Sequence, residues 1–216
     1  SYDPVGDFAP ISLLAAVPNI ISVTPALPVN SLAELVALAK AKPGQLSYAS
    51  SGNGTSTHLA AELFKAAAGI DIAHIPYKGS APAVTDVIAG QVPVLVDSVA
   101  SSTAQVKAGK LKALATTSPK RLLVLPELPT VAESGYPGFQ STAWVGLLAP
   151  AGTPKAIVEQ INAAVLKVMA LPETRERMAG FGAEITTSTP DEFAAHIRSE
   201  MAKLGKVIRD ANIKVN

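Results

Sequence analysis

The fold of this chain is indicated most directly by residues 47–64, which read SYASSGNGTSTHLAAELF. The first four letters form a short apolar segment typical of a strand, the Gly-Asn-Gly that follows marks a tight turn, and residues 56–68 have the apolar spacing of a helix. A strand that leads through a glycine-rich turn into a helix is the repeating unit of α/β proteins. These residues therefore predict an α/β fold.

Helices and strands alternate on both sides of this unit. Before it, Ser31 is followed three residues later by Glu34, and this capping box opens a helix that Pro43 and Gly44 end. After it the predicted elements are a strand at 72–77, a helix at 81–89, a strand at 92–97, a helix at 102–108 and a strand at 111–117. Because parallel neighbours need a crossover connection, the alternation predicts a doubly wound, mostly parallel sheet with helices on both faces.

The remainder of the chain is less regular. Residues 118–139 are rich in proline and glycine, which predicts a surface connector with one short helix near 130–134. A strand at 141–149 follows, and then two helices, at 154–170 and 190–211, each with an apolar stripe. Only that strand and the N-terminal segment DFAPISLL are available to cover the two stripes.

Composition excludes several classes of protein. Hydrophobic residues make up 48% and charged residues 16%, which is typical of a globular chain and not of a disordered one. The net charge of +1 provides no field to attract nucleic acid. The longest apolar run is interrupted by Pro18 and is shorter than the roughly 20 residues of a membrane-spanning helix, so we expect a soluble chain. The absence of cysteine excludes thiol chemistry and disulfides.

The turn at residues 51–58 is the candidate ligand site, because ligands of open α/β sheets bind beyond the carboxyl ends of the strands. Gly52 and Gly54 allow close approach of the main chain, and unpaired amides of the first helical turn can donate to an anion. The turn lacks the GK[ST] ending of a phosphate loop, and Thr57 stands where a dinucleotide fingerprint has its third glycine. We therefore expect a cradle for a small anion such as a carboxylate; the alternative is a tight turn with a helix cap.

Two further turns occupy equivalent places on the predicted sheet. One offers Tyr77 and Lys78, and the other offers Asp97. The alternative for Lys78 is a solvated loop charge, and the alternative for Asp97 is a cap for the next helix. His58 either donates to the ligand or forms a local hydrogen bond.

Metal and catalytic sites are not predicted. The three histidines are scattered and no HExxH pattern occurs, so we expect no metal and no cofactor. No GxSxG elbow or evident carboxylate pair is present, and we expect a protein that is not an enzyme. Trp144, in an apolar strand, is expected in the core and alternatively as a ligand platform.

Several blocks of the chain closely resemble the extracytoplasmic solute receptors of the tripartite tricarboxylate transporter family, also called Bug receptors. They include YDPVGDFAPISLLA, SLAELVALAKAKPGQLSYASSGNGTSTHLAAELF, HIPYKGSAPAVTDVIAGQV, KAGKLKALATTSPKR, LPELPTVAESGYPGF and WVGLLAPAGTP. The resemblance implies a periplasmic-binding-protein-like (type II) fold of two lobes that captures a small carboxylate: a dicarboxylate, a tricarboxylate, an acidic amino acid or an aromatic acid. It also implies a periplasmic location and delivery to membrane transporter subunits, without nucleic acid as a partner.

The resemblance also assigns lobes and ligand residues. Residues 19–142 correspond to a complete lobe 2, whereas residues 1–18 and 143–216 correspond to a lobe 1 that lacks its N-terminal portion, so self-association through the incomplete lobe is expected. The ligand-binding residues it implies are Ser51, Gly52, Asn53, Gly54, Thr55, Ser56, Thr57, His58, Tyr77 and Asp97. A ligand-sensing regulatory module on the same fold and a small hydrolase are the alternative functions.

Overall fold

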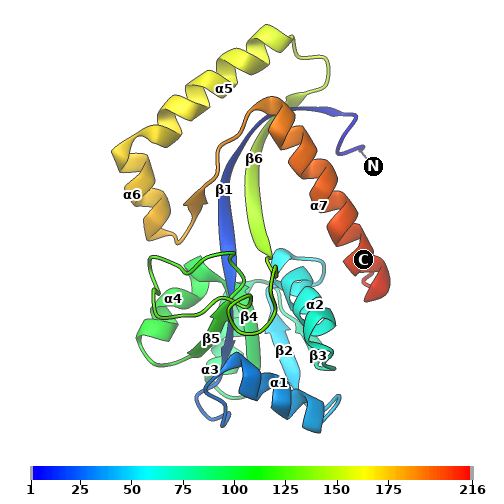
Figure 1. Cartoon of the computed structure of the whole chain (residues 1–216), viewed down its shortest axis with the longest axis vertical. Coiled ribbons are helices and arrows are strands. Elements are labelled where there is room, and N and C mark those ends of the chain that lie inside the picture. The colour runs from blue at the N-terminus through cyan, green and yellow to red at the C-terminus, as the bar shows by residue number, and fades with distance from the viewer. Residues whose placement is uncertain (1, 215–216) are drawn as a thin grey trace. The chain divides into compact units, whose positions relative to one another are not determined.

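A computed structural model describes residues 2–214, which form two compact units (Figure 1). Unit 1 comprises residues 2–17 and Trp144–Lys206, and unit 2 comprises Pro18–Ala143 and residues 207–214. The segment 207–214 thus belongs to unit 2, although the prediction places it in lobe 1. Residues 1, 215 and 216, which the predicted lobe 1 includes, lie outside the described residues.

Unit 2 contains a mixed sheet in the order β3-β2-β4-β1-β5. Strand β2 is parallel to both β3 and β4, whereas β1 runs antiparallel between β4 and β5. The elements of this unit are β1 (Phe8–Val23, shared with unit 1), α1 (Leu32–Ala41), β2 (Ser47–Ser50), α2 (Ser56–Ala68), β3 (Ala73–Pro76), α3 (Ser80–Ile88), β4 (Val94–Ser98), α4 (Val99–Lys107) and β5 (Lys112–Thr116). The predicted alternation of strands and helices is confirmed, and the one antiparallel strand was not foreseen.

Helices cover both faces of this sheet because alternate strand residues point to opposite sides. In β4, Val94 and Val96 pack in one core cluster with the apolar faces of α1 and α2, while Leu95 packs in a second cluster with α3. The capping box predicted for α1 is present: Ser31 caps the helix, and the carboxylate of Glu34 accepts a hydrogen bond from the main-chain N–H of Asn30. The sheet and its helices therefore hold the strand-to-helix turns on a rigid frame.

Unit 1 is built around the first part of β1, which pairs with β6 (Thr142–Pro150) and β7 (Glu184–Ile185). Helices α5 (Lys155–Ala170) and α6 (Pro172–Gly180) and the part of α7 (Pro190–Asp210) up to Lys206 complete it. The start of α7 lies beside β6 (Figure 1). The ring of Phe193 on α7 packs over Gly146 and edge-on against Trp144, both on β6. Buried Asn162 of α5 donates hydrogen bonds to the main-chain oxygens of Ile11 and Ser188, which fastens the helix to β1.

Unit 1 leaves more apolar surface exposed than unit 2. Its large exposed hydrophobic side chains include Val145, Leu147, Leu148, Ile157, Leu166 and Val168. The predicted self-association is consistent with this surface and stays a prediction. Among the described residues, no helix is both long enough and apolar enough to cross a membrane.

Candidate ligand site

The candidate site lies where β2, β3 and β4 end and their helices begin. Because β2 is the parallel neighbour of both other strands, the turns that follow the three strands meet at one edge of the sheet. The main-chain N–H of Tyr77 donates to the oxygen of Ser50 at 3.2 Å, and that of Gly79 donates to the oxygen of Ser51 at 3.0 Å. The turn after β3 is thus fastened directly to the turn between β2 and α2.

The hydroxyl groups of the β2–α2 turn bond mainly to one another. Thr57 Oγ1 accepts from the main-chain N–H of Ser51 at 3.0 Å and lies 2.8 Å from Ser51 Oγ and 2.9 Å from Thr55 Oγ1. Thr55 Oγ1 donates to the oxygen of Gly52 at 2.7 Å. Thr57 is buried, whereas Ser56 and Asn53 are exposed. The cluster stiffens the turn, and Ser56 carries its accessible hydroxyl.

The main-chain amides of the turn divide into two sets. The N–H of Gly52 donates to Ser50 Oγ at 3.2 Å, and that of Gly54 donates to His58 Nδ1 at 3.0 Å. The N–H groups of Asn53, Ser56 and Thr57 have no hydrogen-bond partner within residues 2–214. Two of these three belong to the first turn of α2, where the helix dipole favours a negative charge. The turn therefore presents donors to an anion without a cationic side chain.

His58 forms a local hydrogen bond, one of the two alternatives that its position in the sequence left open. It is 4% exposed, and its Nδ1 accepts the hydrogen bond from Gly54, so this nitrogen is not a donor toward a ligand. Its ring stacks on the ring of His74 at a centroid distance of 3.8 Å and an interplanar angle of 16°. Burial lowers the pKa of His58, which keeps its imidazole neutral.

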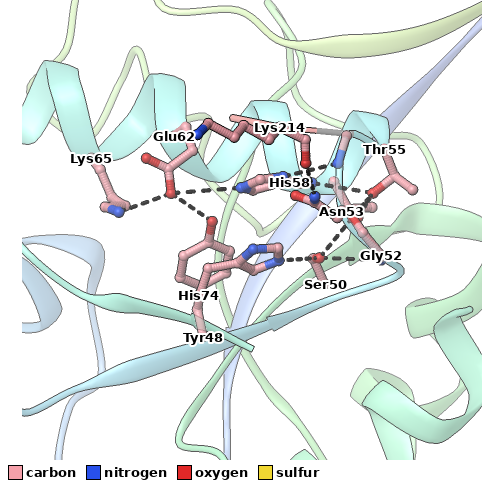
Figure 2. A network of polar contacts seen from close by, with 12 residues as sticks. Tyr48, Ser50, Gly52, Asn53, Thr55, His58, Glu62, Lys65, His74 and Lys214 are labelled. Atoms are coloured by element: carbon pink, nitrogen blue, oxygen red, sulfur yellow. Dashed lines mark hydrogen bonds and ion pairs between the residues drawn. The ribbon is translucent and has the colours of Figure 1, made fainter. Parts of the chain in front are cut away.

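A polar network beneath the turn was not predicted from the sequence (Figure 2). Glu62 Oε1 accepts hydrogen bonds from the hydroxyl of Tyr48 at 2.7 Å and from Lys65 Nζ at 2.8 Å, and it lies 4.0 Å from His58 Nε2. His74 Nε2 lies 2.6 Å from Ser50 Oγ. Burial, and next the charge of His58, lower the pKa of His74 to about 4.

Only part of this network could have been found from the sequence. Tyr48 and His74 are paired residues on neighbouring parallel strands, and Glu62 follows His58 by four residues on one helix face. The helical spacing is visible in the sequence. The strand register is set by packing and could not be read from it.

The contact between Ser50 and His74 has the atom types of a nucleophile and its base, but Ser50 is fully buried. Its hydroxyl also lies 3.2 Å from both the N–H and the oxygen of Gly52. A substrate has no access to this hydroxyl, so the pair does not support the hydrolase alternative. Within the described part of the chain, no group of three or more histidine or carboxylate side chains is placed to hold a metal ion.

Asp97 and Tyr77 have their polar side-chain atoms bonded to protein partners. Asp97 is fully buried and accepts hydrogen bonds from Ser80 Oγ at 2.6 Å and Ser102 Oγ at 3.2 Å; burial raises its pKa against the effect of these bonds. Asp97 is not the cap of α4, because Ser98 occupies that position. The hydroxyl of Tyr77 donates to Asp86 Oδ2 at 2.7 Å, and burial raises the pKa of Tyr77 to about 12.

The remaining candidates are simpler. Lys78 is exposed, as the alternative of a solvated loop charge expects. Asn53 is exposed and its side-chain amide donates to the main-chain oxygen of Lys214, which ties the end of the described chain to the turn. The unpaired amides of the β2–α2 turn remain the candidate donors to a small anion in this α/β unit.

Comparison with known proteins agrees with this class. Residues 1–213 match the family described as the tripartite tricarboxylate transporter family receptor, TctC. The chain is 38% identical over its full length to a protein in the tcbD-tcbE intergenic region of Pseudomonas sp. (strain P51), and it covers 64% of that protein. It is 34% identical over 99% of its length to protein BugT of Bordetella pertussis, of which it covers 66%. The chain belongs to the tripartite tricarboxylate transporter receptor family.

Solved structures of similar proteins have the same fold. The chain superimposes on an R. palustris protein with adipate at a TM-score of 0.87 and 39% identity, covering 98% of this chain and 71% of that one. It superimposes on the periplasmic binding protein BugD at a TM-score of 0.83 and 36% identity, covering 99% of this chain and 72% of that one. It superimposes on MatC of Rhodopseudomonas palustris with bound malate at a TM-score of 0.82 and 30% identity, covering 96% of this chain and 72% of that one. The predicted family and the periplasmic-binding-protein-like fold are confirmed.

Proposed function

We propose that this chain is the ligand-capturing part of a periplasmic receptor that binds a small organic carboxylate and delivers it to the membrane subunits of a tripartite tricarboxylate transporter. The observation that carries the proposal is the set of unpaired main-chain amides at the start of α2, on Asn53, Ser56 and Thr57. The fold and the family support a receptor that performs no chemistry on its ligand.

A dicarboxylate is the ligand class to test first. Two of the similar structures were solved with adipate and with malate, which are both dicarboxylates. A carboxylate has two acceptor oxygens, and each charge-assisted hydrogen bond to it contributes about 1.5–3 kcal/mol. Three unpaired main-chain amides therefore supply enough donors to hold one carboxylate end.

We further propose that unit 2, close in extent to the predicted lobe 2 at residues 19–142, is the lobe that carries the ligand turn. The chain spans about two thirds of the length of the curated relatives it matches. The affinity of a whole receptor is therefore measured on a full-length relative. The contribution of the turn is measured on this chain, by comparing variants.

The decisive experiment uses Ser56, the first residue of α2. Proline is well tolerated at this position of a helix, and it removes the N–H donor; the preceding residue, Thr55, already has the extended conformation that precedes proline. Ser56→Ala is the matched control, because it removes the hydroxyl and keeps the N–H. Isothermal titration calorimetry against a panel of adipate, malate, citrate, glutamate and benzoate measures the outcome.

Ser56→Pro is expected to weaken carboxylate binding by roughly tenfold to a hundredfold, and Ser56→Ala by much less. Equal affinity of Ser56→Pro and the wild type, with the helix intact by circular dichroism, would exclude the Ser56 amide as a donor to the ligand. Failure of every carboxylate to bind the wild-type chain, or formation of a product, would contradict the receptor function.

A further inference from the structure

Two stacked imidazole rings lie directly beneath the proposed ligand turn. The rings of His58 and His74 are 3.8 Å apart at 16°, and the ring of His74 also stacks on Tyr48 at 4.9 Å and 21° (Figure 2). Two positively charged rings at this separation in a buried setting repel strongly. The pair is therefore stable only while at most one ring carries a charge.

Each ring is connected to the turn by hydrogen bonds. His58 Nδ1 accepts from the N–H of Gly54 at 3.0 Å, which requires that this nitrogen carry no proton. His74 Nε2 contacts Ser50 Oγ, which in turn contacts the main chain of Gly52. Protonation of His58 at Nδ1 would direct an N–H against the N–H of Gly54, break that bond and release the glycine that lies between the free amides.

The charged groups around the pair do not reverse this preference. On α2, Glu62 faces His58 Nε2 at 4.0 Å, but its carboxylate already accepts hydrogen bonds from Tyr48 on β2 and from Lys65 on α2. Lys214 also lies at the turn, where its main-chain oxygen accepts a hydrogen bond from the side-chain amide of Asn53. Burial lowers the pKa of both imidazoles, and for His74 to about 4.

We propose that His58 is a proton-sensitive positioning residue for anion capture: the turn presents its amides while His58 Nδ1 is unprotonated, and it releases the carboxylate when acidification protonates that nitrogen. The inference rests on the proposed function, because it assigns the turn to carboxylate binding. His58 acts through Gly54 and does not touch the ligand. His74 supports it by stacking, and repulsion between the rings disfavours a charge on both of them.

The test compares the wild type with three variants by calorimetry with adipate between about pH 7.5 and about pH 4.5. In His58→Asn, the side-chain oxygen occupies the place of Nδ1 and accepts from Gly54 but does not titrate. In His58→Leu the acceptor is lost. His196→Asn, in unit 1, controls for loss of a histidine elsewhere.

Wild-type affinity is expected to fall on acidification, approaching about tenfold per pH unit below the pKa of the pair, relative to His58→Asn. This ratio removes the ligand's own titration, which affects both forms equally. His58→Leu is expected to bind weakly at every pH, and His196→Asn to follow the wild type. Parallel decline of the wild type and His58→Asn would overturn the proposal.

A second measurement needs no ligand. Nitrogen-15 NMR of the imidazoles reports which nitrogen of His58 carries the proton, and hydrogen exchange reports protection of the Gly54 amide. Nδ1 is expected to be unprotonated at neutral pH, and Gly54 to lose protection as His58 titrates. A proton on Nδ1 at neutral pH, or protection of the Gly54 amide that does not change as His58 titrates, would refute the inference whether or not a carboxylate binds. Absence of carboxylate binding alone would contradict only the proposed function.

Discussion

Replacing Gly52 by alanine tests whether the ligand turn depends on a backbone geometry that only glycine adopts. Gly52 has φ +143°, a region that side-chain-bearing residues rarely occupy. A Cβ at this position would lie 3.1 Å from the main-chain oxygen of Tyr77 and 3.5 Å from Thr55 Cγ2. The substitution thus strains the turn and presses it against the neighbouring turn to which it is bonded.

The expected loss of stability has two sources. Holding a non-glycine residue in a sparsely populated backbone region costs of order 1–3 kcal/mol. A shift that relieves the contact with Tyr77 weakens the hydrogen bonds that the main chain of Gly52 makes with Ser50 and Thr55, each of which contributes about 0.5–1.5 kcal/mol. We expect a total of about 2–4 kcal/mol, together with loss of carboxylate binding.

Gly69→Ala is the matched control. Gly69 ends α2 at φ +60°, and no atom lies within 4 Å of its hypothetical Cβ, so alanine there meets backbone strain of about 1 kcal/mol and no contact. Urea unfolding measures both stabilities, and calorimetry with adipate measures both affinities. If Gly52→Ala were no less stable than Gly69→Ala and bound adipate like the wild type, the reasoning about the turn would be wrong.

Four other outcomes follow from contacts in the two units. Gly146→Ala places a Cβ 2.0 Å from Phe193 Cζ, so a loss of about 1–3 kcal/mol or more is expected in thermal unfolding, with recovery in the double variant that also carries Phe193→Leu; an unaltered melting temperature would contradict the packing. Tyr48→Phe removes the hydroxyl that donates to Glu62 and is expected to cost about 1.5–3 kcal/mol in urea unfolding, whereas a change near zero would show that Glu62 is satisfied without it. The pKa of His74 is about 4 in the folded chain and about 6.5 in the unfolded one, so the free energy of unfolding is highest above pH 6.5, where the ring is neutral in both states. At most about 3 kcal/mol of it is lost as the pH falls from 6.5 to 4. A His74→Gln variant should lose less over that range, and identical pH profiles of the two forms would argue against the pKa shift. The exposed apolar surface of unit 1 is expected to cause concentration-dependent association in sedimentation velocity, and a monomer at high concentration would count against it.

Most elements of the fold were predictable because their signals are local. The Ser31 cap, the glycine turn after Ser50 and the glycine after Ala68 mark the ends of helices through the conformation of one or two residues. Helix α6 was missed because it has no buried residue, so the sequence carries no apolar stripe there, and its first residue follows Leu171 without a side-chain cap.

The short helix predicted near 130–134 is wrong, and the reason is specific. Thr130 and Glu133 do form a capping box: the N–H of Thr130 donates to Glu133 Oε2, and the N–H of Glu133 donates to Thr130 Oγ1. The segment forms turns and no helix: the N–H of Ser134 closes a single turn on the oxygen of Thr130, and Gly135 follows at φ +107° and stops propagation. A start signal alone does not make a helix.

The sequence by itself determined the α/β class and the position of the candidate ligand turn, since caps, glycines and apolar spacing act within a few residues, and its resemblance to the Bug receptors indicated the family. Tertiary structure decided which groups of that turn are free. It paired Thr57 with Ser51 and seated His58 under Gly54, and it left the amide of Ser56 unpaired. A donor forms a hydrogen bond with the acceptor that packing places within about 3 Å of it. Strand register likewise places residues that are distant in sequence, such as His74 and Tyr48, against each other.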